Sequence, residues 1–230
     1  MRSALTPIGG NEIELRIRKQ PALGRAEAWL TEIHEFRGKV MYDNGRRPYF
    51  CDDVGRYVDA DEVDFGSWHM TAHLWSEDRI SACVRLVPPE LTTLFHTRRH
   101  LGAERYDEVL RMAGAVGGPV LEVSRLVVSR RVRGDELADK VMAAVVAVGR
   151  AMGAGLLIAQ AATESGWHGR LGWVDHPETD RYVPLYSDTV RVVSYRIEGG
   201  TPEYEQAVTD LCEGLSGVLR REVDAHILHL

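Results

Sequence analysis

The stretch Leu121-Glu122-Val123-Ser124-Arg125-Leu126-Val127-Val128-Ser129 decides the fold, because an apolar strand pattern here surrounds polar side chains. Apolar residues on both faces are typical of a strand that is covered on two sides inside a sheet. Glu122, Ser124 and Arg125 nevertheless fall in its middle. Burying ionised groups costs several kcal/mol unless they are paired. We therefore expect either a structural ion pair or a working site at this strand.

Length and composition indicate one ordinary globular domain over residues 1–230. Hydrophobic residues make up 44% and charged residues 27% of the chain, and the net charge of -6 argues against a general nucleic-acid binder. The three cysteines are widely separated, and no metal-ligand spacing emerges, so we expect no metal site and a cytoplasmic location. The longest apolar region, 141–162, is interrupted by Arg150 and several glycines, so no membrane span is expected.

The elements around the central strand follow from apolar periodicity and from Gly and Pro positions. Helices are predicted from Pro21 to about Met41, over 90–113 in one or two pieces, from Gly134 to about Met152, over 163–173 and over 202–219. Strands are predicted over 12–18, 68–75, 80–87, 119–129, 156–162, 181–185 and 190–197. This order predicts an α/β fold with one central mixed sheet covered on both faces, followed by a C-terminal helix and tail at about 202–230.

This order of elements resembles the GNAT acyltransferase superfamily, which has a three-layer fold with a central twisted sheet. In that superfamily, a long helix after the fourth strand holds the acyl donor's phosphates at its amino end, behind a Gln/Arg-x-x-Gly-x-Gly/Ala signature. Here Arg131-Val132-Arg133-Gly134-Asp135-Glu136 matches the Arg and the first Gly, but lacks the second small residue. Helix starts attract phosphate, so the resemblance implies donor binding by Arg131, Arg133 and Gly134. A solvated basic turn is the alternative.

The polar residues resemble, more narrowly, the acyl-homoserine lactone (autoinducer) synthases and related N-acyl amino acid synthases. Their ordered pattern is matched here by Arg37, Glu62-Val63-Asp64, Arg85 and Glu122-Val123-Ser124-Arg125. Those synthases usually also carry a Phe and a Trp after the first-helix Arg, where this chain has Met41 and Arg47, and a further Asp where it has Ser67. These departures concern the S-adenosylmethionine pocket. The acceptor therefore stays open between S-adenosylmethionine and an amino acid.

The resemblance assigns catalysis to Glu122 and Arg125. Glu122 would serve as general base, directly or through a water, with a structural ion pair to Arg85 or Arg125 as the alternative. Strand alternation separates Glu122 from Arg125, but the bulge common in this GNAT strand would bring Arg125 round. Backbone amides near Val127 and Val128 would bind the donor's pantetheine arm.

Substrate contacts are expected from Arg37, Glu62, Asp64, Arg85, Ser124 and Trp167. For the acidic pair the alternative is a solvated loop, for Arg37 a snorkelling side chain, and for Trp167 a core position. The predicted function is N-acyl transfer from an acyl-carrier-protein (phosphopantetheine) or coenzyme A thioester to the primary amine of an amino acid or S-adenosylmethionine. The alternatives are an acetyl-coenzyme A-dependent small-amine acetyltransferase and a non-catalytic acyl-thioester-binding module.

An acyl carrier protein is a further expected partner. Such carriers are acidic, so Arg98-Arg99 or the cluster Arg130, Arg131 and Arg133 would form its docking site on this acidic chain.

Overall fold

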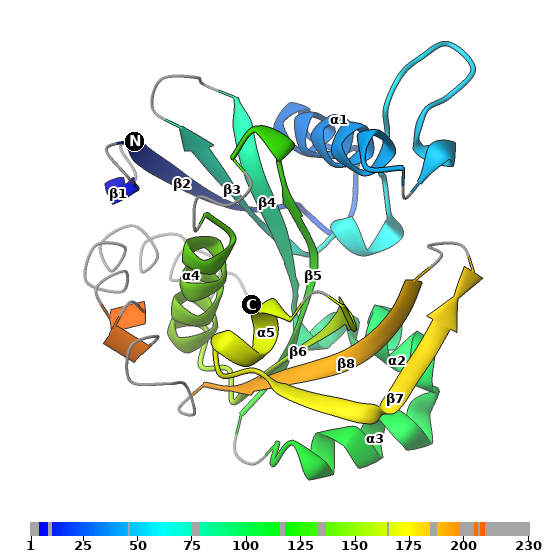
Figure 1. Ribbon diagram of the computed structural model, residues 1–230, viewed down its shortest axis with the longest axis vertical. Coiled ribbons are helices and arrows are strands. Elements are labelled where there is room, and N and C mark those ends of the chain that lie inside the picture. The colour runs from blue at the N-terminus through cyan, green and yellow to red at the C-terminus, as the bar shows by residue number, and fades with distance from the viewer. Residues whose placement is uncertain are drawn as a thin grey trace.

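The computed structural model describes residues 5–8, 11–45, 47–74, 79–115, 118–132, 137–164, 166–184, 188–197, 205–206 and 208–209. Eight strands form one sheet in the order β1-β2-β3-β4-β5-β6-β8-β7 (Figure 1). Their bounds are β1 (Leu5–Ile8), β2 (Asn11–Lys19), β3 (Trp68–Leu74), β4 (Ile80–Val87), β5 (Val120–Val128), β6 (Leu156–Ala162), β7 (Val174–Val183) and β8 (Asp188–Arg196). Among the described strands the β5–β6 pair alone is parallel, so the sheet is mixed.

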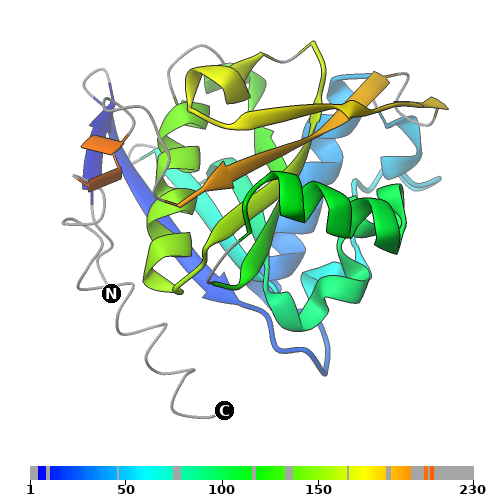
Figure 2. The same ribbon diagram turned by 90° about the horizontal axis from the view of Figure 1, so that it is seen from below.

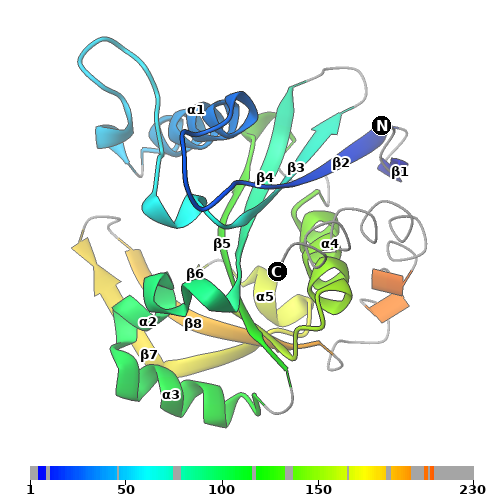
Figure 3. The same cartoon turned by 180° about the vertical axis from the view of Figure 1, so that it is seen from behind.

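Five α-helices and four short 3-10 helices connect the described strands. They are α1 (Ala28–Asp43), η1 (Pro48–Phe50), η2 (Glu62–Asp64), η3 (Pro89–Leu94), α2 (His96–Leu101), α3 (Ala103–Met112), η4 (Arg130–Val132), α4 (Leu137–Ala151) and α5 (Trp167–Arg170). Figure 1 shows α4 on one side of the sheet, and Figure 3, seen from behind, shows α2 and α3 on the other. In the view from below, the strands separate α4 from the α2–α3 pair (Figure 2).

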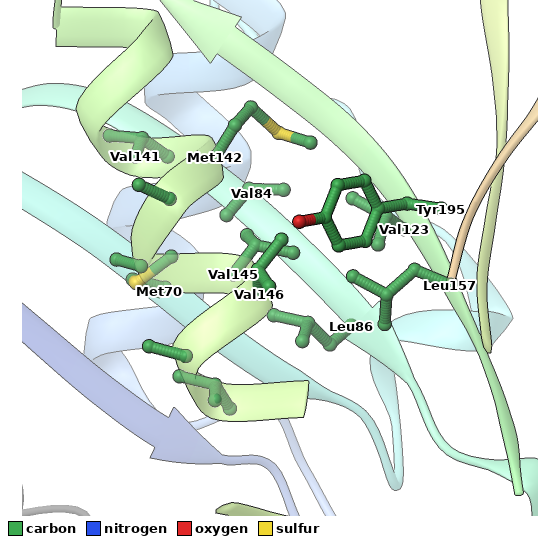
Figure 4. Close-up of a cluster of buried hydrophobic side chains, with 14 of the residues drawn as sticks. Met70, Val84, Leu86, Val123, Val141, Met142, Val145, Val146, Leu157 and Tyr195 are labelled. Carbon is green, nitrogen blue, oxygen red and sulfur yellow. The ribbon is translucent and has the colours of Figure 1, made fainter. Parts of the chain in front are cut away.

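The main core lies between α4 and one face of the sheet. Helix α4 is apolar almost all round, and its buried stretch from Val141 to Gly149 packs against alternate residues of the central strands. Figure 4 shows Met70, Val84, Leu86, Val123 and Leu157 pointing toward this helix. Burial of each such side chain stabilises the fold by about 1.5–3 kcal/mol. The core therefore holds the central strands firmly by one face.

The opposite face of the sheet is covered by two smaller groups of elements. Leu30, Ile33 and Val40 of α1 pack against Cys83 of β4 and Val127 of β5. A second cluster is formed by Val63, Val87, Phe95, Tyr106, Val109, Ile158 and Val192. The polar residues of β4 and β5 lie between these two apolar clusters.

The predicted architecture is confirmed: a central mixed sheet carries helices on both faces. The predicted start of the first helix at Pro21 is wrong, because α1 begins at Ala28. Gly24 has a φ of +113°, which a helix does not accommodate. The side chain of Gln20 also bonds to the carbonyl of Arg25 and the N–H of Glu27, which holds this segment as a loop.

The strand β1 at Leu5–Ile8 and the first half of β7 are additions that the sequence pattern does not predict. Most of the predicted C-terminal helix and tail lies outside the described residues, so the single-domain reading of 1–230 stays a prediction. In the ranges that the structure describes, no helix is both long enough and apolar enough to cross a bilayer.

Candidate active site

A cleft opens where β5 and β6 separate. Their parallel register runs from Val120↔Leu156 to Val123↔Ala159 and stops there, although β5 continues to Val128 and β6 to Ala162. The space of about 230 Å³ between the strand ends is lined by residues of β5, β6 and α2 and by a few residues from α1, the segment after it, α4 and β8: Met41, Arg47, His96, Thr97, Glu122, Val123, Ser124, Arg125, Leu126, Met142, Ala159, Gln160, Ala161, Ala162, Asp188 and Val190. Beyond Val123, the edge of β5 that faces the cleft has no strand partner among the described residues.

A bulge in β5 directs Arg125 toward the polar face of the sheet. Cys83 pairs with Val127 and Arg85 with Ser124, so β5 has one residue more than β4 between these two pairs. Arg125 takes up this extra residue with a φ of 57°, the one positive φ at a described non-glycine residue. A left-handed conformation costs such a residue about 1–2 kcal/mol. The bulge expected from the resemblance is therefore present, and it places the Arg125 side chain on the same side as Ser124 and Glu122.

Asp64 is the centre of a buried charge network beside the cleft. Arg37 of α1 donates to both of its carboxylate oxygens, at 2.9 and 2.8 Å, and Arg85 of β4 donates to Oδ1 at 2.9 Å. Nε2 of His34 lies 2.9 Å from Oδ2. Burial alone would raise the pKa of Asp64, but the bonds from His34 and Arg37 and the charges of both arginines lower it far below its usual range. Asp64 is thus ionised at neutral pH.

Asp59 and Asp61 complete this network on the side nearer the cleft. Asp59 Oδ2 lies 3.3 Å from Arg37 Nε and 3.0 Å from Arg125 Nε. Asp61 Oδ2 lies 3.3 Å from Arg85 Nη1 and 3.4 Å from Arg125 Nη2. Three arginines and three aspartates therefore balance their charges, which is what the cost of burying ions requires.

Glu122 lies at the floor of the cleft and is 1% exposed. Its Oε1 accepts the backbone N–H of His96 at 3.0 Å and its Oε2 accepts that of Thr97 at 2.7 Å. Arg85 and Arg125 pair with aspartates instead. Glu122 therefore anchors the first turn of α2 to β5, and each of its oxygens keeps one further lone pair.

Ser124, Arg85 and Arg37 lie where the sequence places them, within this one polar assembly. Ser124 lines the cleft, and its Oγ accepts a bond from Arg85 Nε at 3.0 Å. Arg85 and Arg37 are 0% and 1% exposed, so the snorkelling alternative for Arg37 is wrong. The solvated-loop alternative is likewise wrong for Asp64, which is fully buried.

Glu62 does not join this assembly. It is exposed and pairs with Arg99 at 2.6 Å, and Asp61, one residue earlier, reaches inward in its place. The side chains of Val127 and Val128 pack in apolar clusters, so their predicted role depends on backbone amides alone. Trp167 begins α5, and its side chain lies outside the described atoms.

The predicted donor loop is described only in part. Arg131 is exposed in η4 and lines a broad surface groove of about 1360 Å³ beside α1, separate from the cleft. Arg133 and Gly134 lie outside the described residues. Across the part of the chain that the structure covers, no group of three or more His, Cys, Asp or Glu side chains could hold a metal ion.

The sequence pattern does not single out Asp59, Asp61, His34 and His96 as members of the assembly. The signal for His34 was present, because it precedes Arg37 by three residues and so shares its helix face. Asp59 and Asp61 belong to the acidic run 59–64, in which the sequence does not reveal which carboxylates turn inward. His96 carries no periodic signal; only the packing of α2 brings it to the cleft.

The comparisons with known proteins agree with this geometry. Residues 47–143 match the family described as "Acetyltransferase (GNAT) domain". The chain has the GNAT fold. The coenzyme A-dependent acyl-homoserine lactone synthase BjaI aligns with a TM-score of 0.56 at 19% identity over 90% of each chain. The acyl-homoserine lactone synthase LasI gives 0.58 at 13% identity over 86% of this chain and 95% of its own.

A third similar structure is an acyl-CoA N-acyltransferase from Pseudomonas aeruginosa, with a TM-score of 0.52 at 18% identity over 79% of this chain and 98% of its own. A search of curated proteins with this sequence gives no match. The predicted resemblance to the GNAT fold is confirmed.

Proposed function

We propose that this protein transfers an acyl group from a thioester to the primary amine of an amino acid or of S-adenosylmethionine. The observation that carries the proposal is the opening of the sheet after Val123↔Ala159, beside a set of buried ionisable side chains. The unpaired edge of β5 offers backbone N–H groups to the pantetheine arm of a donor and to the thioester carbonyl. Similar folds include a synthase whose structure holds S-adenosylmethionine and isopentyl-CoA.

The cleft carries an arginine, Arg47, near a position where the autoinducer synthases have an aromatic residue. Met41 and Arg47, which stand near the usual Phe and Trp positions, both line the cleft together with Arg125. An arginine recognises a carboxylate through charge-assisted hydrogen bonds. We therefore propose an acceptor with an α-amino and an α-carboxylate group, which amino acids and S-adenosylmethionine share.

Glu122 and Arg125 have the catalytic roles in this proposal. Arg125 lines the wall beside the acceptor, and Glu122 lies at the floor. Since both Glu122 oxygens already accept backbone N–H groups, Glu122 serves proton transfer either through a water or by holding another group that accepts the proton.

Mass spectrometry of the products tests the reaction. The protein is incubated with coenzyme A and carrier-protein thioesters from acetyl to dodecanoyl, each with a panel of amino acids and with S-adenosylmethionine. We expect a new amide with at least one pair. Only acetylated small amines would indicate the acetyltransferase alternative. Thiol release without an amide, or binding without turnover, would overturn the proposal.

The donor's carrier is tested by charge reversal at two places. Arg130 and Arg131 lie at the broad groove beside α1, where Arg16, Arg18, Arg56 and Arg79 add positive charge. Arg98 and Arg99 form the second basic pair, on α2. If an acyl carrier protein docks at α2, reversing Arg98 and Arg99 to Glu raises KM for the carrier-protein thioester by about tenfold and leaves KM for the coenzyme A thioester unchanged. Reversing Arg130 and Arg131 should raise KM for both thioesters, because Arg131 is also expected to hold the donor's phosphates. Unchanged KM values for both pairs would contradict carrier docking at these sites.

A further inference from the structure

His96 is held between the two halves of the sheet. Its backbone N–H donates to Glu122 Oε1 on β5 at 3.0 Å, and its carbonyl accepts a bond from Gln160 Nε2 on β6 at 3.1 Å. The side chain lines the cleft and is 29% exposed. The His96 imidazole thus lies in the cleft between β5 and β6, and bonds to both strands fix the backbone of His96.

One ring nitrogen of His96 is engaged by the charge network. Nε2 lies 2.8 Å from Asp61 Oδ2 and 3.1 Å from Arg85 Nη2. A guanidinium only donates hydrogen bonds, so the shorter contact is satisfied when Nε2 carries a proton and donates it to Asp61. This tautomer leaves the lone pair on Nδ1, which has no hydrogen-bond partner among the described residues.

Asp61 holds the imidazole through Nε2, as the aspartate of other His–Asp pairs orients its histidine. The guanidinium groups of Arg85 and Arg125 are both paired with the same Asp61 carboxylate. Glu122 faces the backbone of His96. Compared with Glu122, whose oxygens both hold backbone N–H groups, His96 presents the more accessible base.

We propose that His96 accepts the proton of the attacking amine and that Glu122 is a positioning residue for it. This inference rests on the proposed acyl transfer. The amine nitrogen attacks the thioester carbonyl carbon and forms the C–N bond, while its proton passes to Nδ1 of His96. The C–S bond then breaks, and the sulfur leaves as a thiol after taking up the proton that His96 received.

His96→Gln tests the proposal, because it preserves the backbone bonds to Glu122 and Gln160. With the acyl-coenzyme A and amino acid that give most product, we expect kcat to fall by about 10²–10⁴-fold. The rise of kcat/KM between pH 5 and 8, where imidazoles titrate, should be lost, whereas any limb due to the acceptor amine stays. Calorimetry should show unchanged binding of the acyl-coenzyme A. Added imidazole should restore part of the rate.

His100→Gln is the matched control, since it makes the same change one turn later in α2 and lies outside the cleft. We expect its kcat within about twofold of the wild type, against the loss predicted for His96→Gln. A His96→Gln protein with wild-type rate and pH profile would overturn the inference while leaving acyl transfer intact. Absence of product from the wild type itself would instead overturn the proposed function.

If His96→Gln does not fold, NMR of the wild-type protein can still test the role of His96. Binding of a thioether analogue of the donor together with the amine should shift the NMR resonances of the His96 ring. An unmoved His96 ring in the ternary complex would overturn the inference.

Discussion

Arg37 and Asp64 lie face to face in the interior, joined by two parallel N–H···O bonds of 2.9 and 2.8 Å between residues 27 positions apart in the chain. Arg37 belongs to α1 and Asp64 ends η2, just before β3. The pair therefore fixes the first helix against the loop that carries Asp59 and Asp61. Because both side chains are excluded from water, neither can lose its partner without a large cost.

Replacing Asp64 by Asn should destabilise the fold strongly. The change keeps the shape but leaves Arg37 and Arg85 buried with less compensating charge, which costs about 3–5 kcal/mol. Urea unfolding followed by circular dichroism measures this loss. Glu62→Gln, two residues earlier and exposed, is the matched control and should change stability by less than about 1 kcal/mol. Equal effects of the two changes would contradict a central role for Asp64.

Stability should decrease as the pH falls from about 6.5 to 4, because of His69. Burial is the largest influence and lowers the pKa of His69 from 6.5 to about 4, although the nearby charge of Asp64 opposes it. In this interval the unfolded chain binds a proton at His69 that the folded protein does not, so acid favours unfolding. Urea midpoints measured across pH 4 to 7 test this. His69→Gln should show a shallower decrease, and identical slopes in both proteins would contradict it.

A second decrease should follow below about pH 4. The pKa of Asp61 is lowered because its contacts with His96 and the charge of Arg85 outweigh burial, and that of Asp64 is lowered likewise. For a carboxyl with a depressed pKa in the folded state, the stabilisation is complete above its ordinary pKa of 3.8 and is lost as the pH falls below it. Asp61→Asn should therefore flatten the acid limb of the unfolding curve. An unchanged acid limb would show that Asp61 is not linked to folding.

Substitutions of Arg125 by Gly and by Ala should differ in stability but lower activity alike. At a φ of 57°, Gly carries no steric penalty, whereas Ala keeps it. Both Arg125→Gly and Arg125→Ala lose the ion pairs to Asp59 and Asp61, so we expect the Gly variant to be the more stable by about 1 kcal/mol. Both variants should form amide much more slowly than the wild type. A more stable Ala variant in thermal unfolding would contradict the left-handed conformation.

Gly38 should not tolerate a side chain. A Cβ atom there would lie 2.6 Å from the backbone nitrogen of Val58 and 2.9 Å from the carbonyl carbon of Tyr57, and neither backbone atom can turn aside. Gly38→Ala should therefore displace the segment before Asp59 and lower stability by about 1–3 kcal/mol. Gly169→Ala, where the added Cβ meets nothing within 4 Å, is the control. A neutral Gly38→Ala would show that α1 lies further from this segment.

Much of the fold was predictable because its strands and helices have clear apolar periods. Strands β4 and β6 and most of α4 lie where the pattern of Val, Leu and Ala places them. The first helix was predicted too early because Pro21 allows a helix start, whereas Gly24 and the bonds of Gln20 are decided by the local backbone. β1 is too short to give a period of its own.

The site was predictable where a charged residue interrupts an apolar element. Arg37 in a helix and Arg85, Glu122 and Arg125 in strands satisfy this condition, and the structure brings all four beside one cleft. Glu62 and Asp61 could not be distinguished, because in a single-turn helix the inward direction depends on the bonds that Asp61 and Asp64 make to each other's backbone. The position of His96 at the cleft depends on how α2 packs against the sheet, and no local sequence pattern predicts that packing.

The first turn of α2 bridges β5 and β6 where the sheet opens. Glu122 of β5 holds it through the N–H of His96 and Gln160 of β6 through the carbonyl of the same residue, so the backbone of His96 and two side chains join the two strands where the sheet opens. Gln160→Asn would shorten the side chain and remove its bond to the His96 carbonyl on the β6 side, without changing the ion pairs of the charge network. We therefore expect the width of the cleft, and with it the size of the group that can enter, to respond to changes at Gln160.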